Sequence, residues 1–365
     1  MNTTARQRGG LVISLDFELA WGVHDSLGSE GAYRVNLLGA RKAVPRILEL
    51  FNEFHIEATW ATVGFLFAES REELMQFIPA VKPTYRDLRR DPYRIELGVD
   101  EASDPLHYAA SLVKEIASTP GQEVASHTFS HYYCLEDGQT VEQFAADLSA
   151  AQAIARSKGF EVSSLVLPRH QNRSDYLPVI AQAGFDAYRS NEPNWLNRPA
   201  RAGSSGNLVR AARLIDSWVP LTGANLVPWA STRPDANGLV DVRESRFLRP
   251  AGTMGKLLDD LHYSRIASAM HYAAKQGHLF HLWWHPHNFG AKQEDNLALL
   301  RRLLVLHAKF RRDYGFGSYS MRTVSESARI VTHMQQDRQP VGPRPAALHA
   351  CRTGGRQLSA VVGSE

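Results

Sequence analysis

The 365-residue sequence predicts an α/β fold with a largely parallel sheet. Short apolar runs that are typical of buried strands alternate about seven times with longer segments whose apolar residues recur at helical spacing. Such alternation is the pattern of strand–helix–strand units, whose consecutive strands pair in parallel. Hydrophobic residues make up 44% of the chain and charged residues 22%, which is an ordinary globular composition. The glycine-rich patterns GxGxxG and GxxxxGK[ST] are absent, so a Rossmann or P-loop nucleotide site is not supported.

The amino-terminal half is expected to supply the first strands of this sheet. The expected strands are 11–15, 57–63 and the run before His127, and the expected helices are 41–54, 106–117 and 140–158. Ser70 and Thr140 each have Glu or Gln three residues later, which is the capping-box signature of a helix start. The segment 83–105 is charged and rich in breakers, so we expect an insertion loop there.

The carboxy-terminal half continues the alternation around one irregular section. The expected strands are 165–167, 185–188 and 279–284, and the expected helices are 174–183, 254–275, 294–312 and 323–334. Residues 192–206 contain Pro, Gly, Ser and Asn and are expected to form a loop, while 208–250 is the least regular part of the sequence. Residues 1–10 are expected to be flexible, and the Pro-, Gly-, Arg- and Ser-rich residues 335–365 to form a disordered tail.

Charge and cysteine content argue against several functional classes. The net charge is only +3 and the arginines are scattered, so nucleic acid is not an expected partner. Two distant cysteines, Cys134 and Cys351, do not suit a secreted disulfide scaffold. The first apolar run, 11–15, is too short for a signal-peptide core or a transmembrane segment. We therefore expect a cytoplasmic location.

Two histidines lie directly after one of the expected strands. His127 and His131 are four residues apart, and on one turn of helix these positions face the same way. Both imidazoles could then reach one ion, and neutral imidazole is a common ligand of zinc. Two ligands do not complete a site, so a third must come from elsewhere in the chain.

Ionisable side chains also follow other expected strands. With a period of two, Asp16 and Glu18 point to the same side after the first strand. The full set of these groups is Asp16 and Glu18, His127 and His131, Arg169 and His170, and His285 and His287. Because active sites of α/β barrels lie at the carboxyl ends of the strands, the four groups indicate one site.

These motifs, in this order, resemble the polysaccharide deacetylase family, also called carbohydrate esterase family 4 or the NodB-homology domain. The motifs are Leu15-Asp16-Phe17-Glu18, His127-Thr128-Phe129-Ser130-His131, Pro168-Arg169, the looser Asp216 and Trp218, and His285. The resemblance covers roughly 10–330, and the two-histidine motif is its most specific part. It implies a distorted (β/α)7-type, NodB-like barrel that forms a single catalytic domain over 11–334.

The resemblance also implies a reaction and the residues for it. The reaction would be metal-dependent removal of an N-acyl group, expected to be acetyl, from an amino sugar in surface-polysaccharide or nucleotide-sugar metabolism. Glu18, His127 and His131 would bind a divalent metal, expected to be Zn²⁺. Asp16 would be the general base, Arg169 would hold it in place, and His285 would protonate the leaving amine. The substrate is expected to be a carbohydrate, free or linked to a nucleotide, lipid or glycan.

The sequence departs from the family pattern and leaves alternatives open. The usual adjacent aspartates are replaced by Asp16-Phe17-Glu18, so either Glu18 or Asp16 could be the third ligand. Either His285 or His287 could be the acid. Substrate contacts are expected from His287, Asn288 and Trp284, while Arg246 and Arg249 are interpreted as surface residues, with phosphate or carboxylate binding as the alternative. The alternative functions are a deformylase or other C–N amidohydrolase, and a non-catalytic carbohydrate-binding relative.

Overall fold

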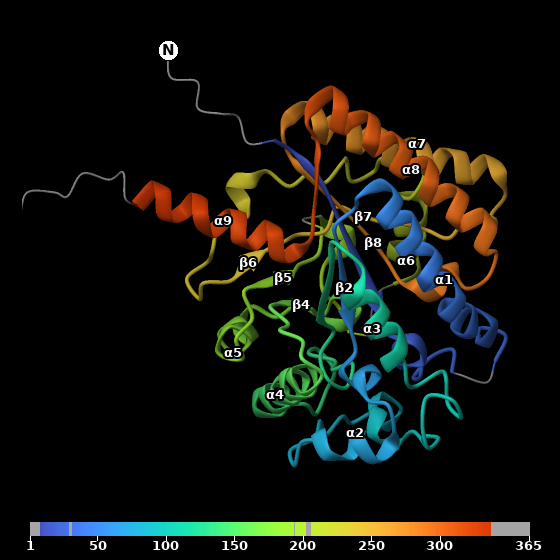
Figure 1. Cartoon of the computed structure of the whole chain (residues 1–365), viewed down its shortest axis with the longest axis vertical. Coiled ribbons are helices and arrows are strands. Elements are labelled where there is room, and N and C mark those ends of the chain that lie inside the picture. The colour runs from blue at the N-terminus through green and yellow to red at the C-terminus, as the bar shows by residue number, and fades with distance from the viewer. Residues whose placement is uncertain (1–7, 29–30, 193, 202–205, 337–365) are drawn as a thin grey trace, which may run out of the picture.

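A parallel sheet at the centre of the molecule carries the site, with helices outside it (Figure 1). The computed structural model describes residues 8–28, 31–192, 194–201 and 206–336. Most of the expected flexible N-terminus and tail lies outside these ranges, but residues 335–336, expected to begin the tail, belong to the last helix. The strands are β1 (Gly10–Phe17), β2 (Ala58–Thr62), β3 (Gln122–Ser126), β4 (Ser164–Val166), β5 (Ala187–Arg189), β6 (Val240–Asp241), β7 (Arg246–Phe247), β8 (Leu279–Trp284) and β9 (Gly317–Tyr319).

The sheet follows the order β6-β5-β4-β3-β2-β1-β8-β7, and β9 pairs in addition with β1. Strands β6 and β7 are two ends of one short stretch of chain. The N–H of Val242 donates to the carbonyl oxygen of Tyr188 in β5, and the N–H of Ser245 donates to that of His281 in β8, each at 2.9 Å. This stretch therefore leaves one edge of the sheet and joins the other, which curls the sheet into a distorted barrel. The expected barrel and the single-domain organisation are confirmed.

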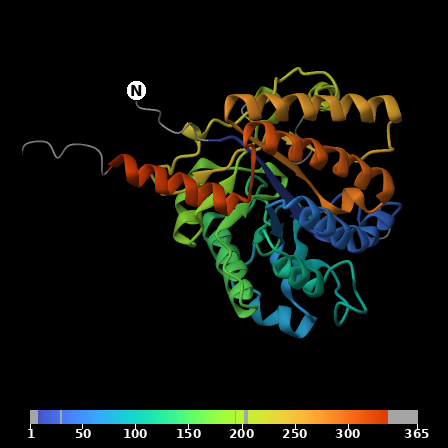
Figure 2. The ribbon, with the colours of Figure 1, turned by 45° about the horizontal axis from the view of Figure 1, so that its top comes forward.

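Helices cover the outside of the curled sheet. They are α1 (Arg34–Phe54), α2 (Arg71–Phe77), α3 (Ala110–Ser118), α4 (Val141–Ser157), α5 (Leu177–Gln182), α6 (Asn207–Ile215), α7 (Lys256–Gln276), α8 (Gln293–Tyr314) and α9 (Met321–Gln336). Helices α1, α8 and α7 pack side by side along one flank (Figure 2). The capping box predicted at Thr140 is present at the start of α4. None of the helices in the described ranges is long and apolar enough to cross a membrane.

Strand β1 separates two apolar layers, because its side chains alternate between the two faces of the sheet. Leu11, Ile13 and Leu15 pack in the large core between sheet and helices. Val12 faces the opposite way, into a smaller apolar core inside the barrel. Asp16 has the same parity as Val12, so β1 changes from apolar to ionisable as it approaches its carboxyl end.

Two segments that we expected to be a loop or irregular contain short helical elements. The segment 83–105 contains two short 3₁₀ turns, η3 (Leu88–Arg90) and η4 (Pro92–Arg94), and the side chain of Arg90 forms an ion pair with Asp25. Helix α6 lies inside the section that we expected to be irregular. It contains no buried residue, so packing in the core does not fix its position.

Candidate active site

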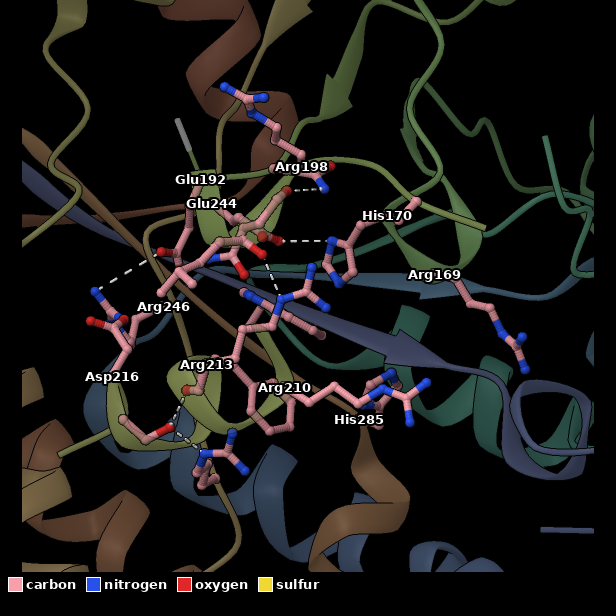
Figure 3. Close-up of a pocket in the computed structure, with 18 of the residues that line it drawn as sticks. Arg169, His170, Glu192, Arg198, Arg210, Arg213, Asp216, Glu244, Arg246 and His285 are labelled. Carbon is pink, nitrogen blue, oxygen red and sulfur yellow. Dashed lines mark hydrogen bonds and ion pairs between the residues drawn. The ribbon is translucent and has the colours of Figure 1, made fainter. Parts of the chain in front are cut away.

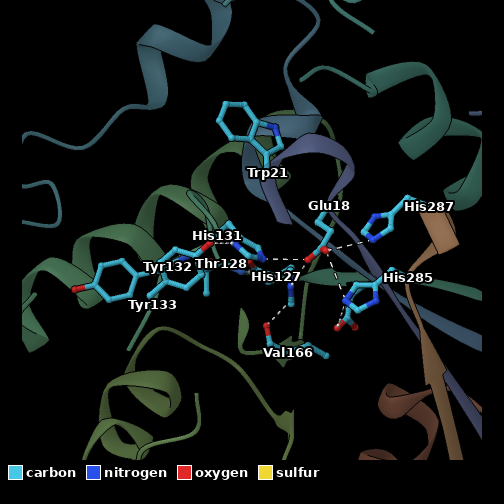
Figure 4. Close-up of polar contacts among 12 residues, drawn as sticks. Glu18, Trp21, His127, Thr128, His131, Tyr132, Tyr133, Val166, His285 and His287 are labelled. Carbon is cyan, nitrogen blue, oxygen red and sulfur yellow. Dashed lines mark hydrogen bonds and ion pairs between the residues drawn. The ribbon is translucent and has the colours of Figure 1, made fainter. Parts of the chain in front are cut away.

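Ionisable side chains from four strands meet at the carboxyl edge of the sheet. Asp16 lies near the end of β1, His127 directly follows β3, Arg189 ends β5 and His285 directly follows β8. Parallel strands bring all their carboxyl ends to the same edge, so residues distant in sequence become neighbours. Figure 4 shows Glu18 between His127 and His131 on one side and His285 and His287 on the other.

Glu18, His127 and His131 form a compact cluster suited to a metal ion. The Oε2 atom of Glu18 lies 3.0 Å from Nε2 of His131 and 3.3 Å from Nε2 of His127. Potential ligand atoms of the three residues all lie within 4.8 Å of one another. Glu18, His127 and His131 are 4%, 1% and 2% exposed, so all three are buried.

The two histidines meet through a loop and not through the helical turn that we expected. Thr128 and His131 have φ angles of +63° and +58°, which lie outside the right-handed α-helical region. Asp147 of α4 accepts hydrogen bonds from the backbone N–H of Phe129 at 2.7 Å and of Ser130 at 3.1 Å. These bonds hold the loop in its irregular shape, because they replace the partners that a helix would provide.

The hydrogen bonds of the histidines leave one nitrogen of each directed at Glu18. Nδ1 of His127 lies 2.8 Å from the carbonyl oxygen of Val166, so Nδ1 donates this hydrogen bond and Nε2 is the nitrogen that faces Glu18. That Nε2 is buried and has no hydrogen-bond partner. Burial lowers the pKa of His131 to about 4, against the opposing effect of Glu18, so its imidazole is neutral near pH 7. Neutral imidazoles and a carboxylate are a donor set that fits a divalent ion such as zinc.

Asp16 is held by Arg189, and this corrects the role expected for Arg169. The guanidinium of Arg189 donates to both carboxylate oxygens of Asp16, each at 2.7 Å. Burial would raise the pKa of Asp16, but Arg189 and, to a smaller extent, His127 and His285 lower it to about 2.

Arg169 belongs to a different ion pair. Its guanidinium contacts Asp25 and lies over the ring of Tyr133, 4.7 Å from the ring centre. The backbone of Arg169 has a φ of +54°, in the 3₁₀ turn η5 (Pro168–His170), and Figure 3 shows its side chain directed away from the other labelled arginines. Arg189 directly follows the strand predicted at 185–188, so the strand-end rule that selected the other residues could have found it.

His285 and His287 lie on the far side of Glu18 from the first histidine pair. Nε2 of His285 is 3.6 Å from Oε1 of Glu18 and 3.8 Å from Oδ2 of Asp16. Nε2 of His287 is 3.9 Å from the same Oε1. The side chain of His285 is 24% exposed and that of His287 only 4%, so His285 is the one that a substrate can reach.

The turn that follows His285 is held by a close helix contact. Residues Pro286–Phe289 form the 3₁₀ turn η9, which packs on α1. A Cβ on Gly290 would lie 1.9 Å from the carbonyl oxygen of Asn36, so only glycine allows this approach. Asn288 donates to the hydroxyl of Tyr33 at 3.2 Å, and is thus part of this contact.

Two further expectations change with the structure. Trp284 is fully buried and stacks on Phe289, so it belongs to the core and cannot contact a substrate. Its neighbour Trp283 faces the opposite way and lines a cavity with His285. Asp216 lies away from the metal cluster and pairs with Arg246 and Arg265, as described below.

The barrel interior contains further polar groups, and of these only His170 was selected from the sequence. The hydroxyl of Ser14 lies 2.8 Å from Nε2 of His281 and also accepts from Arg189 at 2.8 Å. Glu244 lies 3.0 Å from Nδ1 of His170 and 3.6 Å from Nε of Arg189. These contacts orient Arg189 and so act on Asp16 indirectly.

Comparison with known protein families gives a match over part of the chain. The polysaccharide deacetylase family model matches residues 38–188, a range that includes His127 and His131. The resemblance to the polysaccharide deacetylases is confirmed. The match supports a deacetylase, while Asp16, Glu18 and His285 lie outside the matched range. No curated protein sequence matches the chain significantly.

Solved structures share the fold at low sequence identity. A protein assigned to the polysaccharide deacetylases from Mycobacterium smegmatis has 13% identity and a TM-score of 0.57, over 91% of this chain and 94% of the other. The Puue allantoinase has 13% identity and a TM-score of 0.50, over 91% and 93%. A further protein assigned to the polysaccharide deacetylases, from Pseudomonas aeruginosa PAO1, has 12% identity and a TM-score of 0.49, over 90% and 92%. At these identities the likeness to the first two structures shows the fold alone.

Proposed function

We propose that the chain is a metal-dependent amidohydrolase that removes an N-acyl group, expected to be acetyl, from an amino sugar. The observation that carries the proposal is the convergence of Glu18, His127 and His131 beside Asp16 and His285. The family match supports the deacetylase chemistry. Surface-polysaccharide or nucleotide-sugar metabolism is the setting that we infer for the substrate.

In this proposal Glu18, His127 and His131 hold a divalent ion, with zinc as the expected metal. The fit rests on the buried, unpartnered Nε2 of His127 and on its fixed tautomer. An ion of this kind, when bound, acidifies a coordinated water and polarises an acyl oxygen. Three protein ligands with an open position are the arrangement that hydrolytic zinc sites use.

Asp16 and His285 divide the proton transfers between them. The carboxylate of Asp16 remains ionised near neutral pH because its pKa is about 2, and it accepts the proton of the attacking water. An amine leaves poorly as an anion, so it needs a proton donor, and imidazole titrates nearest to neutral pH. His285 reaches solvent and lies within 4 Å of both carboxylates, so we assign it the donor role.

The test is acetate release from N-acetyl amino sugars by zinc-loaded protein, together with measurement of bound zinc. His127→Asn keeps a donor near the carbonyl of Val166 but lacks the ligand nitrogen, so we expect loss of zinc and of acetate release. Asp16→Asn should keep zinc and lose acetate release by about 100-fold or more, as removal of a general base does. His55→Asn is the matched control, because His55 is exposed at the end of α1, away from the cluster. Equal acetate release from all four proteins would refute the proposal.

A second candidate is hydrolysis of a small non-sugar amide. The Puue allantoinase shares the fold with a TM-score of 0.50, so the fold does not restrict the substrate to sugars. Formyl amides belong to the same alternative, because their hydrolysis needs the same groups. A substrate panel of N-acetyl sugars, N-formyl sugars and small cyclic amides separates these possibilities by relative kcat/KM.

A further inference from the structure

A cavity of about 430 Å³ opens directly beside the metal cluster. His285 contributes to both, so a substrate whose amide lies at the cluster can extend into the cavity. The rings of Phe247 and Trp283 form an aromatic wall next to His285, with centres 4.6 Å apart. Figure 3 shows several arginine side chains around this cavity.

Four arginines of the cavity wall have no carboxylate partner among the described residues. They are Arg198, Arg210, Arg213 and Arg249. In the described part of the chain, Arg198 and Arg210 form no ion pair or side-chain hydrogen bond. Arg213 donates from Nε to the carbonyl of Leu196 at 2.6 Å, and Arg249 donates from Nε to the hydroxyl of Ser217. The terminal nitrogens of these guanidinium groups therefore remain available to a ligand.

Two carboxyl groups of the same wall are already paired. Asp216 forms ion pairs with Arg246 and with Arg265, the latter at 2.9 Å. Glu244 pairs with His170 at 3.0 Å. Neither carboxylate is therefore free to neutralise the four arginines.

The third carboxyl group carries little charge near neutral pH. Burial raises the pKa of Glu192 to about 8, although Arg246 opposes the shift. Positions 193 and 202–205 are Pro, Ala, Gly, Ser and Ser, so they add no charge in this part of the sequence. The formal net charge of the whole chain is only +3, so the excess of positive charge is a local property of the cavity.

Burial makes the excess of positive charge in the cavity unfavourable when no anion is bound. Burial lowers the pKa of Arg249, and burial together with Arg210 lowers the pKa of Arg213. A partly buried cation without a counter-charge loses hydration and gains little in return. Guanidinium groups match phosphate oxygens with paired hydrogen bonds, and several of them together suit a ligand with more than one negative charge.

We propose that this cavity binds a phosphate or diphosphate group of the substrate. In combination with the proposed function, on which this step rests, the substrate is an N-acyl amino sugar presented as a phosphate ester. The phosphate could come from a soluble nucleotide or from a lipid carrier. Helix α6, which carries Arg210 and Arg213, also leaves the apolar Leu208 88% exposed and Ile215 47% exposed. A lipid carrier is therefore one of the two sources that the experiment separates.

The first experiment measures binding and does not depend on hydrolysis. Pyrophosphate is titrated calorimetrically into the full chain, with and without chelator, so that binding to a metal is distinguished from binding to the arginines. The double variant Arg210→Gln, Arg249→Gln should weaken binding by about 100-fold, since each charge-assisted hydrogen bond contributes about 1.5–3 kcal/mol. The corresponding Arg→Lys variant keeps the charge and should recover part of the affinity.

Arg156→Gln is the matched control, because Arg156 is exposed near the end of α4 and does not line the cavity. Farnesyl phosphate is titrated in parallel, and tighter binding of it than of pyrophosphate identifies a lipid carrier. Pyrophosphate binding that is absent, or equal in wild type and the Arg→Gln variant, overturns the proposal. Preferential binding of glucuronate would overturn it as well, since the ligand would then be a carboxylate.

The second experiment separates this inference from the proposed function. The kcat/KM ratio for UDP-N-acetylglucosamine over N-acetylglucosamine should exceed about 10 in wild type and fall toward one in the Arg→Gln variant, following the binding energies above. If pyrophosphate binds through the arginines but no amide is hydrolysed, the proposed function fails and the anion site stands. If both sugars are hydrolysed equally and pyrophosphate does not bind, the anion site fails and the proposed function stands.

Discussion

At the scale of single residues, the site depends on which arginine faces which acid. Arg189 is buried to 1% exposure and meets Asp16 through two parallel hydrogen bonds, whereas Arg169 meets Asp25 in the loop after β1. A planar guanidinium fixes a carboxylate in orientation as well as in charge, which an ammonium cannot do. Asp16 is therefore positioned through Arg189, and not through the arginine that its sequence motif suggested.

Replacement of Arg189 should affect catalysis and stability together. Arg189→Gln leaves the buried carboxylate of Asp16 unpaired, so we expect the free energy of unfolding to fall by about 3–5 kcal/mol. Arg189→Lys keeps the charge without the paired hydrogen bonds, so we expect kcat to fall by about 10-fold or more with a smaller loss of stability. Urea unfolding and steady-state kinetics measure the two effects. Arg169→Gln is the comparison, and a larger loss of kcat from Arg169 than from Arg189 would contradict the assignment.

At the scale of elements, helix α4 shapes the loop that carries both histidines. Asp147 lies on the inner face of α4, 1% exposed, and accepts from the N–H groups of Phe129 and Ser130. Burial raises its pKa to about 6, against the opposing effect of the hydrogen bonds from Ser130 and Phe129. The loop is thus held by a carboxyl group whose ionised form is expensive to bury.

Asp147 should therefore give the protein a recognisable pH dependence. A carboxyl group with a raised folded-state pKa contributes stability that is fully present below the unfolded pKa and lost as pH rises through the folded pKa. From the ordinary value of 3.8 and the folded value of about 6, this contribution falls by about 1.4 kcal/mol between about pH 5 and pH 8. Asp147→Asn removes the titration, so urea unfolding at the two pH values should differ from wild type by this amount. Asp313→Asn, exposed on α8, should show no such difference; parallel pH profiles for wild type and Asp147→Asn would exclude the effect.

At the scale of the whole molecule, the barrel brings parts of the chain that are distant in sequence together at the proposed metal site. Glu18 follows β1, the histidine loop follows β3 and His285 follows β8, and the stretch between β6 and β7 completes the ring. A ligand that binds all three metal-binding residues therefore stabilises contacts between strands that are distant in sequence. Ligand binding to the folded state alone raises stability by mass action.

Zinc should accordingly raise the melting temperature of the whole domain. At zinc concentrations about 100 times the Kd, the stabilisation is about 2.7 kcal/mol, which corresponds to a shift of several degrees. Differential scanning calorimetry with zinc, and again after chelation, measures the shift. His127→Asn should abolish it and His55→Asn should retain it. A shift of equal size in His127→Asn would mean that zinc binds elsewhere.

Local patterns were sufficient for the strands β1 to β5 and β8 with most of the helices between them, for the capping box at Thr140 and for the residues at the ends of β1, β3 and β8. These features depend on neighbours within a few positions, and such information is present in the sequence itself. The partner of Asp16, the loop geometry of His127 and His131 and the inward face of Trp283 depended on long-range packing. These three features depend on which strands become neighbours when the sheet curls, because the neighbouring strands and helices supply the partners of each side chain. The arginine cavity follows the same rule, because only the folded barrel brings the arginines of α6 to His285.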